Sequence, residues 1–208
     1  MKKTFAALTL LLGLGAGASA GVHLILFGGY AATPESAPGD GAVIGAGVGF
    51  RLSPMFSLDI TAGRWIIPVS PSDNGLSRGN LTEIPIALEL RARFPLDKGR
   101  FAAYAAGGLG YALHSFALHS DFAADWDEAG FDIEERVDHG LAVHVGAGLE
   151  VGLGPAVVLD IGAKYTILRT KGSWAMADLV GGESLGGPLD NLNFDTLAVV
   201  AGFRVAFR

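Results

Sequence analysis

The sequence of 208 residues contains no cysteine, which excludes disulfide bonds, metal–thiolate sites and a thiol nucleophile. Beyond its first 20 residues it has no run that approaches the ~20 consecutive apolar residues of a membrane-spanning helix. Basic residues are few: 15 Lys and Arg stand against 21 Asp and Glu, and this balance argues against a nucleic-acid partner. If the chain enters a membrane, it does so as strands.

The N-terminus has the pattern of a secretory signal peptide. Lys2 and Lys3 provide the positive start, residues 5–14 the apolar core, and residues 18–20 the small-residue cleavage site. The alternative, a retained membrane helix, is disfavoured because the apolar run is short and rich in glycine. We therefore expect residues 1–20 to be a cleaved signal peptide and residues 21–208 to form one domain.

The stretch Leu81–Phe94 predicts one long strand with two chemically different faces. Its apolar face carries Ile84, Ile86, Leu88, Leu90, Ala92 and Phe94, and its other face carries Glu83, Ala87, Glu89, Arg91 and Arg93. Such a strand exceeds the roughly five or six residues usual in soluble sheets and is long enough to cross a bilayer at a tilt. A mean hydropathy of +0.41 and 31 glycines agree with strands that turn one face to lipid.

Seven further segments show strand patterns, which gives eight expected strands: Val22–Tyr30, Ala42–Leu52, Phe56–Ile67, Leu81–Phe94, Phe101–His114, Gly140–Gly152, Ala156–Thr170 and Phe194–Phe207. Short turns at 53–54, 95–99 and 154–155 alternate with longer connections at 31–41, 68–80, 115–139 and 171–193. This layout predicts an all-β fold, an eight-stranded antiparallel up-and-down transmembrane β-barrel with short periplasmic turns and four longer extracellular loops. The expected location is the bacterial outer membrane.

Glycine placement indicates which strand faces point inward. Gly45, Gly47 and Gly49 share one face with Arg51, and segment 140–152 repeats this small, polar pattern. Glycine weakens a strand but suits the narrow lumen of an eight-stranded barrel, so the apolar faces are expected to meet lipid. The alternative is a secreted soluble barrel of the lipocalin type. Two residues do not fit easily: Pro85, for which we expect a bulge, and Arg64, which falls on the lipid-facing side.

The segment Ile84–Phe116 resembles the OmpW family of small outer-membrane barrels. A strand that contains a proline, a short turn and a strand rich in glycine and tyrosine follow one another, and Tyr104–Tyr111 matches the last of these without its proline. The aromatic-ended closing strand Leu197–Phe207 is similar as well. The resemblance implies passage of small, largely apolar compounds through a narrow barrel, with lateral escape toward the membrane.

Patterns for catalysis and for metal binding are weak. His114–Ser115 and His119–Ser120 place His and Ser on opposite faces of a strand, so we expect no enzyme, with a lipid acyl hydrolase or transferase as the alternative. The acidic segment 115–139 lacks the EF-hand spacing and predicts a solvated loop, or a lid over the barrel mouth; divalent-ion bridging to lipopolysaccharide is the alternative. Gly181-Gly182 and Gly186-Gly187 predict flexible loop, and no metal or cofactor site is expected.

Charged residues on inward-facing positions are expected to form a layer near the periplasmic end of the lumen. They comprise Asp59, Glu89, Arg91, Arg93, Glu150, Asp160 and Arg204. Charges in a narrow, poorly solvated lumen must pair, so we expect a plug rather than an aqueous pore. Above it, Trp65, His114, His144 and Lys164 are expected to line an upper cup that opens to the loops.

Two functions remain open on the sequence alone. The first is a narrow transport barrel for small hydrophobic or amphipathic solutes. The second is a structural or interaction barrel that stabilises the outer membrane or binds a surface partner through its loops. The expected partners are outer-membrane lipid and lipopolysaccharide; solute identity and oligomeric state do not follow from the pattern.

Overall fold

The computed structural model describes residues 21–33, 40–69, 78–97 and 100–207. The expected signal peptide, residues 1–20, lies outside the described residues, as do residues 34–39 and 70–77 of the first two long connections. No described helix combines the length and apolar character that crossing a membrane requires.

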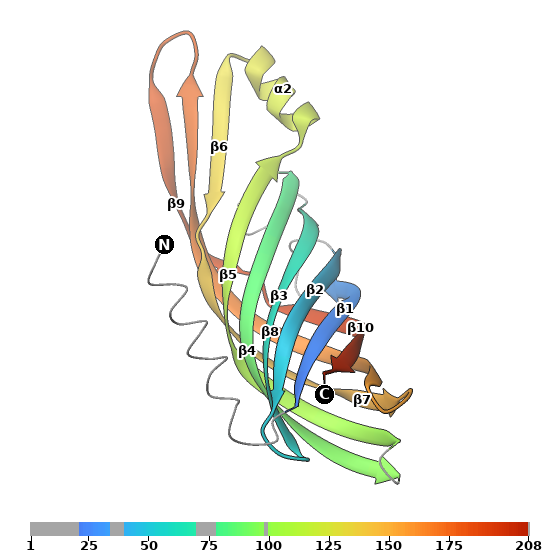
Figure 1. The fold of residues 1–208 in the computed structure, drawn as a ribbon. Helices are drawn as coiled ribbons and strands as arrows, with labels where there is room; N and C mark the ends of the chain where they lie inside the picture. Colours follow the sequence, from blue (N-terminus) through green and yellow to red (C-terminus); the bar gives the residue numbers. More distant parts are fainter. Residues whose placement is uncertain (1–20, 34–39, 70–77, 98–99, 208) are drawn as a thin grey trace, which may run out of the picture.

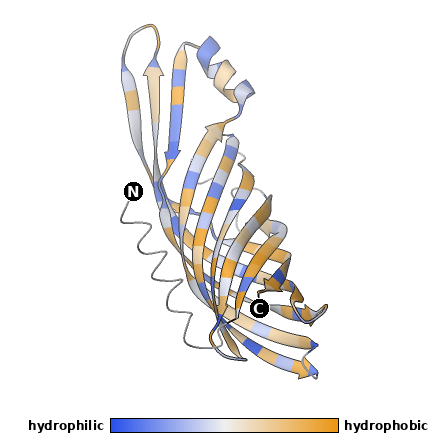
Figure 2. Cartoon of the chain, viewed as in Figure 1, coloured by the Kyte–Doolittle hydropathy of each residue, from blue (hydrophilic) through white to orange (hydrophobic). Residues whose placement is uncertain are grey.

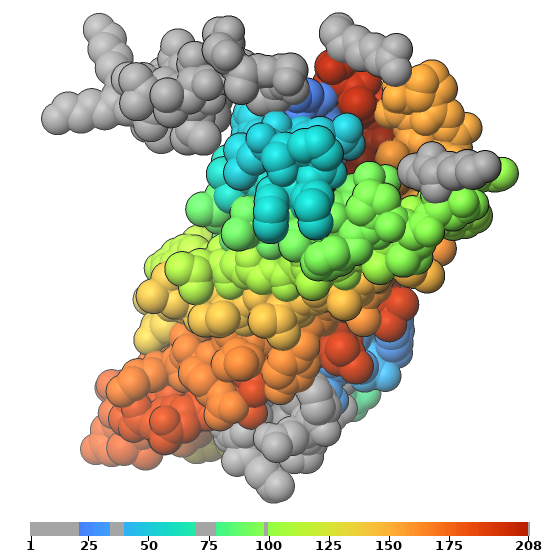
Figure 3. Space-filling view, turned by 90° about the horizontal axis from the view of Figure 1, so that it is seen from below, coloured from blue at the N-terminus to red at the C-terminus, as the bar shows by residue number. Residues whose placement is uncertain are grey.

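Eight of the strands form a closed antiparallel ring (Figure 1). They are β1 (Val22–Ala32), β2 (Gly41–Arg51), β3 (Phe56–Val69), β4 (Gly79–Asp97), β5 (Phe101–Leu118), β7 (Gly140–Gly152), β8 (Val157–Asp178) and β10 (Thr196–Ala206). Each pairs with its neighbour in this order, and β10 returns to pair with β1. In Figure 3 the surface colours pass from cyan through green and yellow to orange, because neighbours in the chain are also neighbours in the wall. The predicted up-and-down barrel is confirmed.

The apolar faces of the strands point outward. Leu109 and Leu141 are 64% and 76% exposed, whereas Asp59 and Glu89 are buried. Figure 2 shows the resulting alternation of hydrophobic and hydrophilic residues along the wall. A soluble barrel would show the opposite arrangement, because its apolar side chains would fill the interior.

Two of the expected loops are instead largely regular structure, so the predictions for 115–139 and 171–193 were wrong. β5 continues to Leu118 and is followed by α2 (Ser120–Glu128) and β6 (Phe131–Val137), while β8 continues to Asp178 and is followed by β9 (Ser184–Asn193). The upper part of β8 pairs with β6 on one edge and with β9 on the other. Together α2, β6, β9 and residues 169–178 of β8 form what we call the extension, which rises beyond one side of the wall in Figure 1.

Local contacts hold the elements of the extension in place. Trp126 of α2 lies edge-on to Phe122 and to Phe131, with ring centroids 6.3 and 6.1 Å apart, and this packs the helix against β6. In the turn between β8 and β9, the backbone N–H groups of Gly181 and Val180 donate to the Asp178 carboxylate and lower the pKa of Asp178. Gly182 has a φ of 71°, which suits glycine, but Gly186 and Gly187 lie within β9 rather than in a flexible loop.

The bulge expected at Pro85 is absent, and the pairing is interrupted instead. Ala62 pairs with Ile86 and Trp65 pairs with Glu83, but the two positions between them are unpaired in the β3–β4 ladder. The register is the same on both sides of this gap, and β4 remains paired with β5 through it. Proline has no N–H to donate, which accounts for a local loss of pairing.

Candidate functional site

The inward charges near the short-turn end of the barrel form one contiguous cluster of ion pairs. Arg91 lies within 3.5 Å of carboxylate oxygens from strands β3, β4, β7 and β8, namely those of Asp59, Glu89, Glu150 and Asp160. The side chain of Arg91 is 9% exposed, so these contacts replace most of its contact with water. The arginine thus links four of the eight strands.

A second arginine completes the cluster on the opposite wall. Arg204 of β10 bonds to Asp59 and Asp160, and its Nη1 donates to His23 Nε2 at 2.7 Å. Arg93 closes the lower side through an Nε–Oε2 contact of 2.6 Å with Glu150. These contacts bring together all seven charged residues predicted for the lumen. We call these seven residues the charge cluster.

Small residues make room for these side chains. A Cβ added at Gly49 would strike His23 and Asp59, and one added at Gly162 would strike the Tyr104 hydroxyl. Tyr104 in turn places its ring 3.7 Å from the Arg91 guanidinium carbon, in cation–π contact. The glycine-rich inward face seen in the sequence thus has a packing cause.

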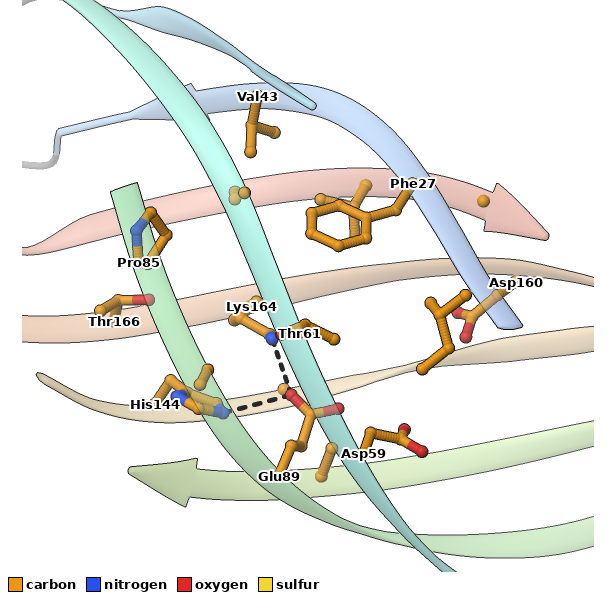
Figure 4. A pocket seen from close by; sticks show the side chains of 18 of the residues that line it. Phe27, Val43, Asp59, Thr61, Pro85, Glu89, His144, Asp160, Lys164 and Thr166 are labelled. Atoms are coloured by element: carbon orange, nitrogen blue, oxygen red, sulfur yellow. Dashed lines mark ion pairs between the residues drawn. The ribbon is translucent and has the colours of Figure 1, made fainter. Parts of the chain in front are cut away.

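Glu89 connects the charge cluster to the space above it. Its carboxylate lies 2.7 Å from Lys164 Nζ and 3.2 Å from His144 Nε2, as the dashed lines in Figure 4 show. Glu89, Glu150, Asp59 and Asp160 contribute four negative charges, which Arg91, Arg93, Arg204 and Lys164 balance. The interior is therefore close to neutral at this level when His23 and His144 are uncharged.

A cavity extends from the charge cluster into the barrel. Its upper walls are largely apolar and include Phe27, Val43, Trp65 and Pro85, and Glu89, His144 and Lys164 contribute polar groups nearer the cluster (Figure 4). Gly63 and Pro85, the residues opposite one another at the gap between β3 and β4, both line the cavity. Of the expected upper lining, Trp65, His144 and Lys164 border this space.

His114 does not line the cavity, contrary to the expectation. Its Nδ1 lies 2.8 Å from the carbonyl oxygen of Asp138, and its backbone N–H donates to His139 Nδ1. Its ring also packs on Phe194, with centroids 5.6 Å apart. His114 thus connects β5 to the turn between β6 and β7. The sequence predicted a loop in this region, so this contact could not be predicted.

An apolar layer rather than an open cup lies on the extension side of the cavity. Its largest fully buried side chains are Ile67, Leu81, Leu168, Leu192 and Phe194, each at most 1% exposed. Leu192 lies in β9 and Phe194 directly after it, so the pairing of β9 with β8 brings both to this layer.

Three residues of the lumen were not among the predicted site residues: His23, Tyr104 and Glu83. Each occupies an inward position, and each is buried. His23 was hidden because β1 is apolar on both faces, and Tyr104 because it was read as part of a family motif. Glu83 sits on the charged face of β4, which was the available signal.

The described residues contain no arrangement for hydrolysis or metal binding that we recognise. His114 is buried and Ser115 exposed, so they lie on opposite faces of β5. No cluster of three or more His, Cys, Asp or Glu suited to a metal ion occurs within residues 21–33, 40–69, 78–97 and 100–207.

Solved structures with this architecture are small outer-membrane barrels. OprG from Pseudomonas aeruginosa is 16% identical with a TM-score of 0.66, over 92% of this chain and 98% of that one. Neisserial surface protein A is 14% identical with a TM-score of 0.57, over 89% and 97%. The outer membrane protein AlkL is 16% identical with a TM-score of 0.50, over 93% of each chain. At these identities the likeness concerns the fold.

The sequence also matches a family model over almost its whole length. Residues 4–204 match the outer membrane protein beta-barrel domain. No curated protein matches the sequence. The predicted resemblance to small outer-membrane barrels and the predicted location in the bacterial outer membrane are confirmed. The closed ring and the lipid-facing apolar surface are consistent with this match. This chain belongs to the outer membrane protein β-barrel family.

Proposed function

We propose that this barrel carries small apolar or amphipathic solutes from its cavity sideways into the membrane. The observation that carries the proposal is the position of the cavity directly behind the gap between β3 and β4, where Gly63 and Pro85 line it. A wall without pairing hydrogen bonds at this point separates more easily than a continuous ladder.

The charge cluster supports a lateral route over an axial one. An apolar solute that moved through the lumen to the periplasm would have to separate buried ion pairs, and each unpaired charge costs several kcal/mol. At the gap, in contrast, Ile84 occupies an unpaired position and Ile86 borders it, and these side chains are 40% and 47% exposed on the lipid side. A solute leaving there passes these apolar side chains and the exposed Arg64, which lies opposite Ile84 in the gap.

The apolar layer supports selection of apolar solutes at the entrance. Side chains such as Ile67 and Leu81 offer no hydrogen bonds, so a polar solute that enters the layer loses its hydrogen bonds to water without replacement. An apolar solute has no such hydrogen bonds to lose. The layer thus favours apolar cargo over ions and sugars.

Restoring the missing hydrogen-bond donor tests the lateral route. We expect Pro85→Ala to slow uptake of a small fluorescent hydrocarbon probe into proteoliposomes several-fold, because its N–H allows β3 and β4 to pair without interruption. Pro68→Ala is the matched control, since Pro68 lies in the same strand pair opposite Asn80 without interrupting the ladder. Equal uptake by both variants and the native protein would overturn the lateral route.

An interaction role is the second candidate, and the extension favours it. Leu179, Val180 and Leu185 at the tip of the β8–β9 hairpin are 59%, 91% and 64% exposed, well beyond the ring. Exposed apolar residues on a projecting hairpin are suited to contact a surface partner.

A further inference from the structure

One carboxylate of the cavity has no Lys or Arg partner among the described residues. Glu83 lines the cavity and its side chain is 1% exposed, yet its Oε2 accepts no hydrogen bond within the described part of the chain. The other carboxylates that line the cavity, Asp59, Glu89 and Asp160, each have a Lys or Arg partner. A buried carboxylate without a donor is costly, so this oxygen is a candidate ligand contact.

The nearest basic group does not satisfy Glu83. His114 Nε2 lies 3.5 Å from Glu83 Oε2, and neither atom has a hydrogen-bond partner. The Nδ1 of His114 faces the carbonyl oxygen of Asp138, which can only accept, so Nδ1 carries the proton of this bond. The 3.5 Å separation of Nε2 and Oε2 is longer than the distance of about 2.7–3.2 Å in a protein hydrogen bond, so His114 leaves Oε2 open to a nearer donor.

An aromatic face adjoins the same carboxylate. Trp65 pairs directly with Glu83 across β3 and β4, and both side chains lie on the inward face and border the cavity. Directly opposed side chains on a sheet are close enough to contact one ligand group together. A carboxylate beside an indole is suited to an alkylammonium, which donates to the oxygen and lies near the ring.

We propose that the cavity binds amphipathic primary amines, with the ammonium group between Glu83 and Trp65 and the alkyl chain against the apolar wall. This inference rests on the proposed function in that it names a solute class for the same cavity. Phe27, Val43 and Pro85 provide the apolar wall for the chain. The donor-free oxygen requires an N–H, so a primary ammonium binds more tightly than a quaternary one of equal length.

Tryptophan fluorescence can report binding at this site. The chain has three tryptophans, and Trp126→Phe with Trp174→Phe leaves Trp65 as the sole emitter. In this background, refolded in detergent, we expect hexylammonium to change Trp65 emission saturably, and hexyltrimethylammonium and hexanoate to bind at least ten-fold more weakly. Glu83→Gln should weaken hexylammonium by a similar factor. Glu134→Gln, which removes an exposed charge in β6, is the matched control and should leave the affinity unchanged.

The outcomes separate this inference from the proposed function. Equal binding of hexylammonium by Glu83→Gln and the parent, with both migrating as folded protein in unheated gels, would overturn the amine site. Tight binding of hexanoate would overturn it as well. If the native protein carries neutral hydrocarbon probe without binding hexylammonium, the amine site fails and the transport role stands. If it binds hexylammonium through Glu83 but carries no probe, the proposed transport role is wrong and the amine site stands.

Discussion

Arg91 shows how one residue can determine the character of the whole lumen. A guanidinium has donors in several directions, so it can meet carboxylates from four strands at once, which a lysine cannot do in the same way. Its desolvation cost is offset only while those partners remain in place. The cluster therefore combines two roles, joining the strands and filling the periplasmic half of the lumen.

We predict that Arg91→Ala both destabilises the barrel and raises its ion conductance. Removal leaves four carboxylates short of a partner, which is expected to cost about 3 to 5 kcal/mol in the free energy of unfolding. Urea titration measures the first effect, and planar-bilayer recording the second; the native protein should show little steady conductance. Arg136→Ala, at a side chain that is 77% exposed, should change neither quantity. A large stable channel in the native protein would refute the closed floor.

Among the strands, β4 combines the most features of the barrel. It spans Gly79–Asp97, pairs with β3 and β5, and alternates lipid-facing with lumen-facing residues. Its outward row meets lipid, its inward row supplies Glu83, Glu89, Arg91 and Arg93, and Pro85, the first of its two prolines, coincides with the gap in the wall.

The two faces of β4 should respond differently to substitution. Leu88, the central residue of the strand, is 47% exposed on the lipid side, and Leu88→Arg is expected to destabilise by about 2 to 4 kcal/mol. Ala87→Ser, on the inward face one position away, should change the free energy of unfolding much less. Urea unfolding in lipid vesicles measures both. Equal losses would mean that the two faces have been assigned the wrong way round.

The whole molecule combines a closed ring with the extension. Ring pairing on β8 ends at Leu168 on the β7 side and at Thr166 on the β10 side, and the extension begins above these residues. The exposed apolar tip of the hairpin lies farther out, beyond Trp174 and Gly187. Cavity, charge cluster and gap all lie within the ring.

Shortening the hairpin tests this division. We expect replacement of residues 175–186 by Asn-Gly, which forms a tight turn between paired strands, to leave heat-modifiable migration and probe uptake close to native. A shortened protein that fails to fold would show that the extension stabilises the ring. A shortened protein that folds but loses uptake would place part of the solute path in the extension.

The sequence by itself determined the properties that depend on period-two alternation. Which residues of β2, β3, β4, β7, β8 and β10 point inward follows from alternation along each strand, so the ring, its lipid-facing surface and the inward position of Asp59, Arg91 and Arg204 were all predictable. The inward position of the glycines was predictable for the same reason.

Only the tertiary structure decided which residues meet. The stagger between strands places Arg91 against Asp160, separates His114 from the cavity and leaves Glu83 opposite Trp65, and none of these pairings is encoded in the spacing along the chain. β6 and β9 were missed because their short, glycine- and charge-rich segments become strands through pairing with β8, a partner distant in sequence for β6. Alternation is a local property, whereas strand pairing and stagger depend on the closed ring.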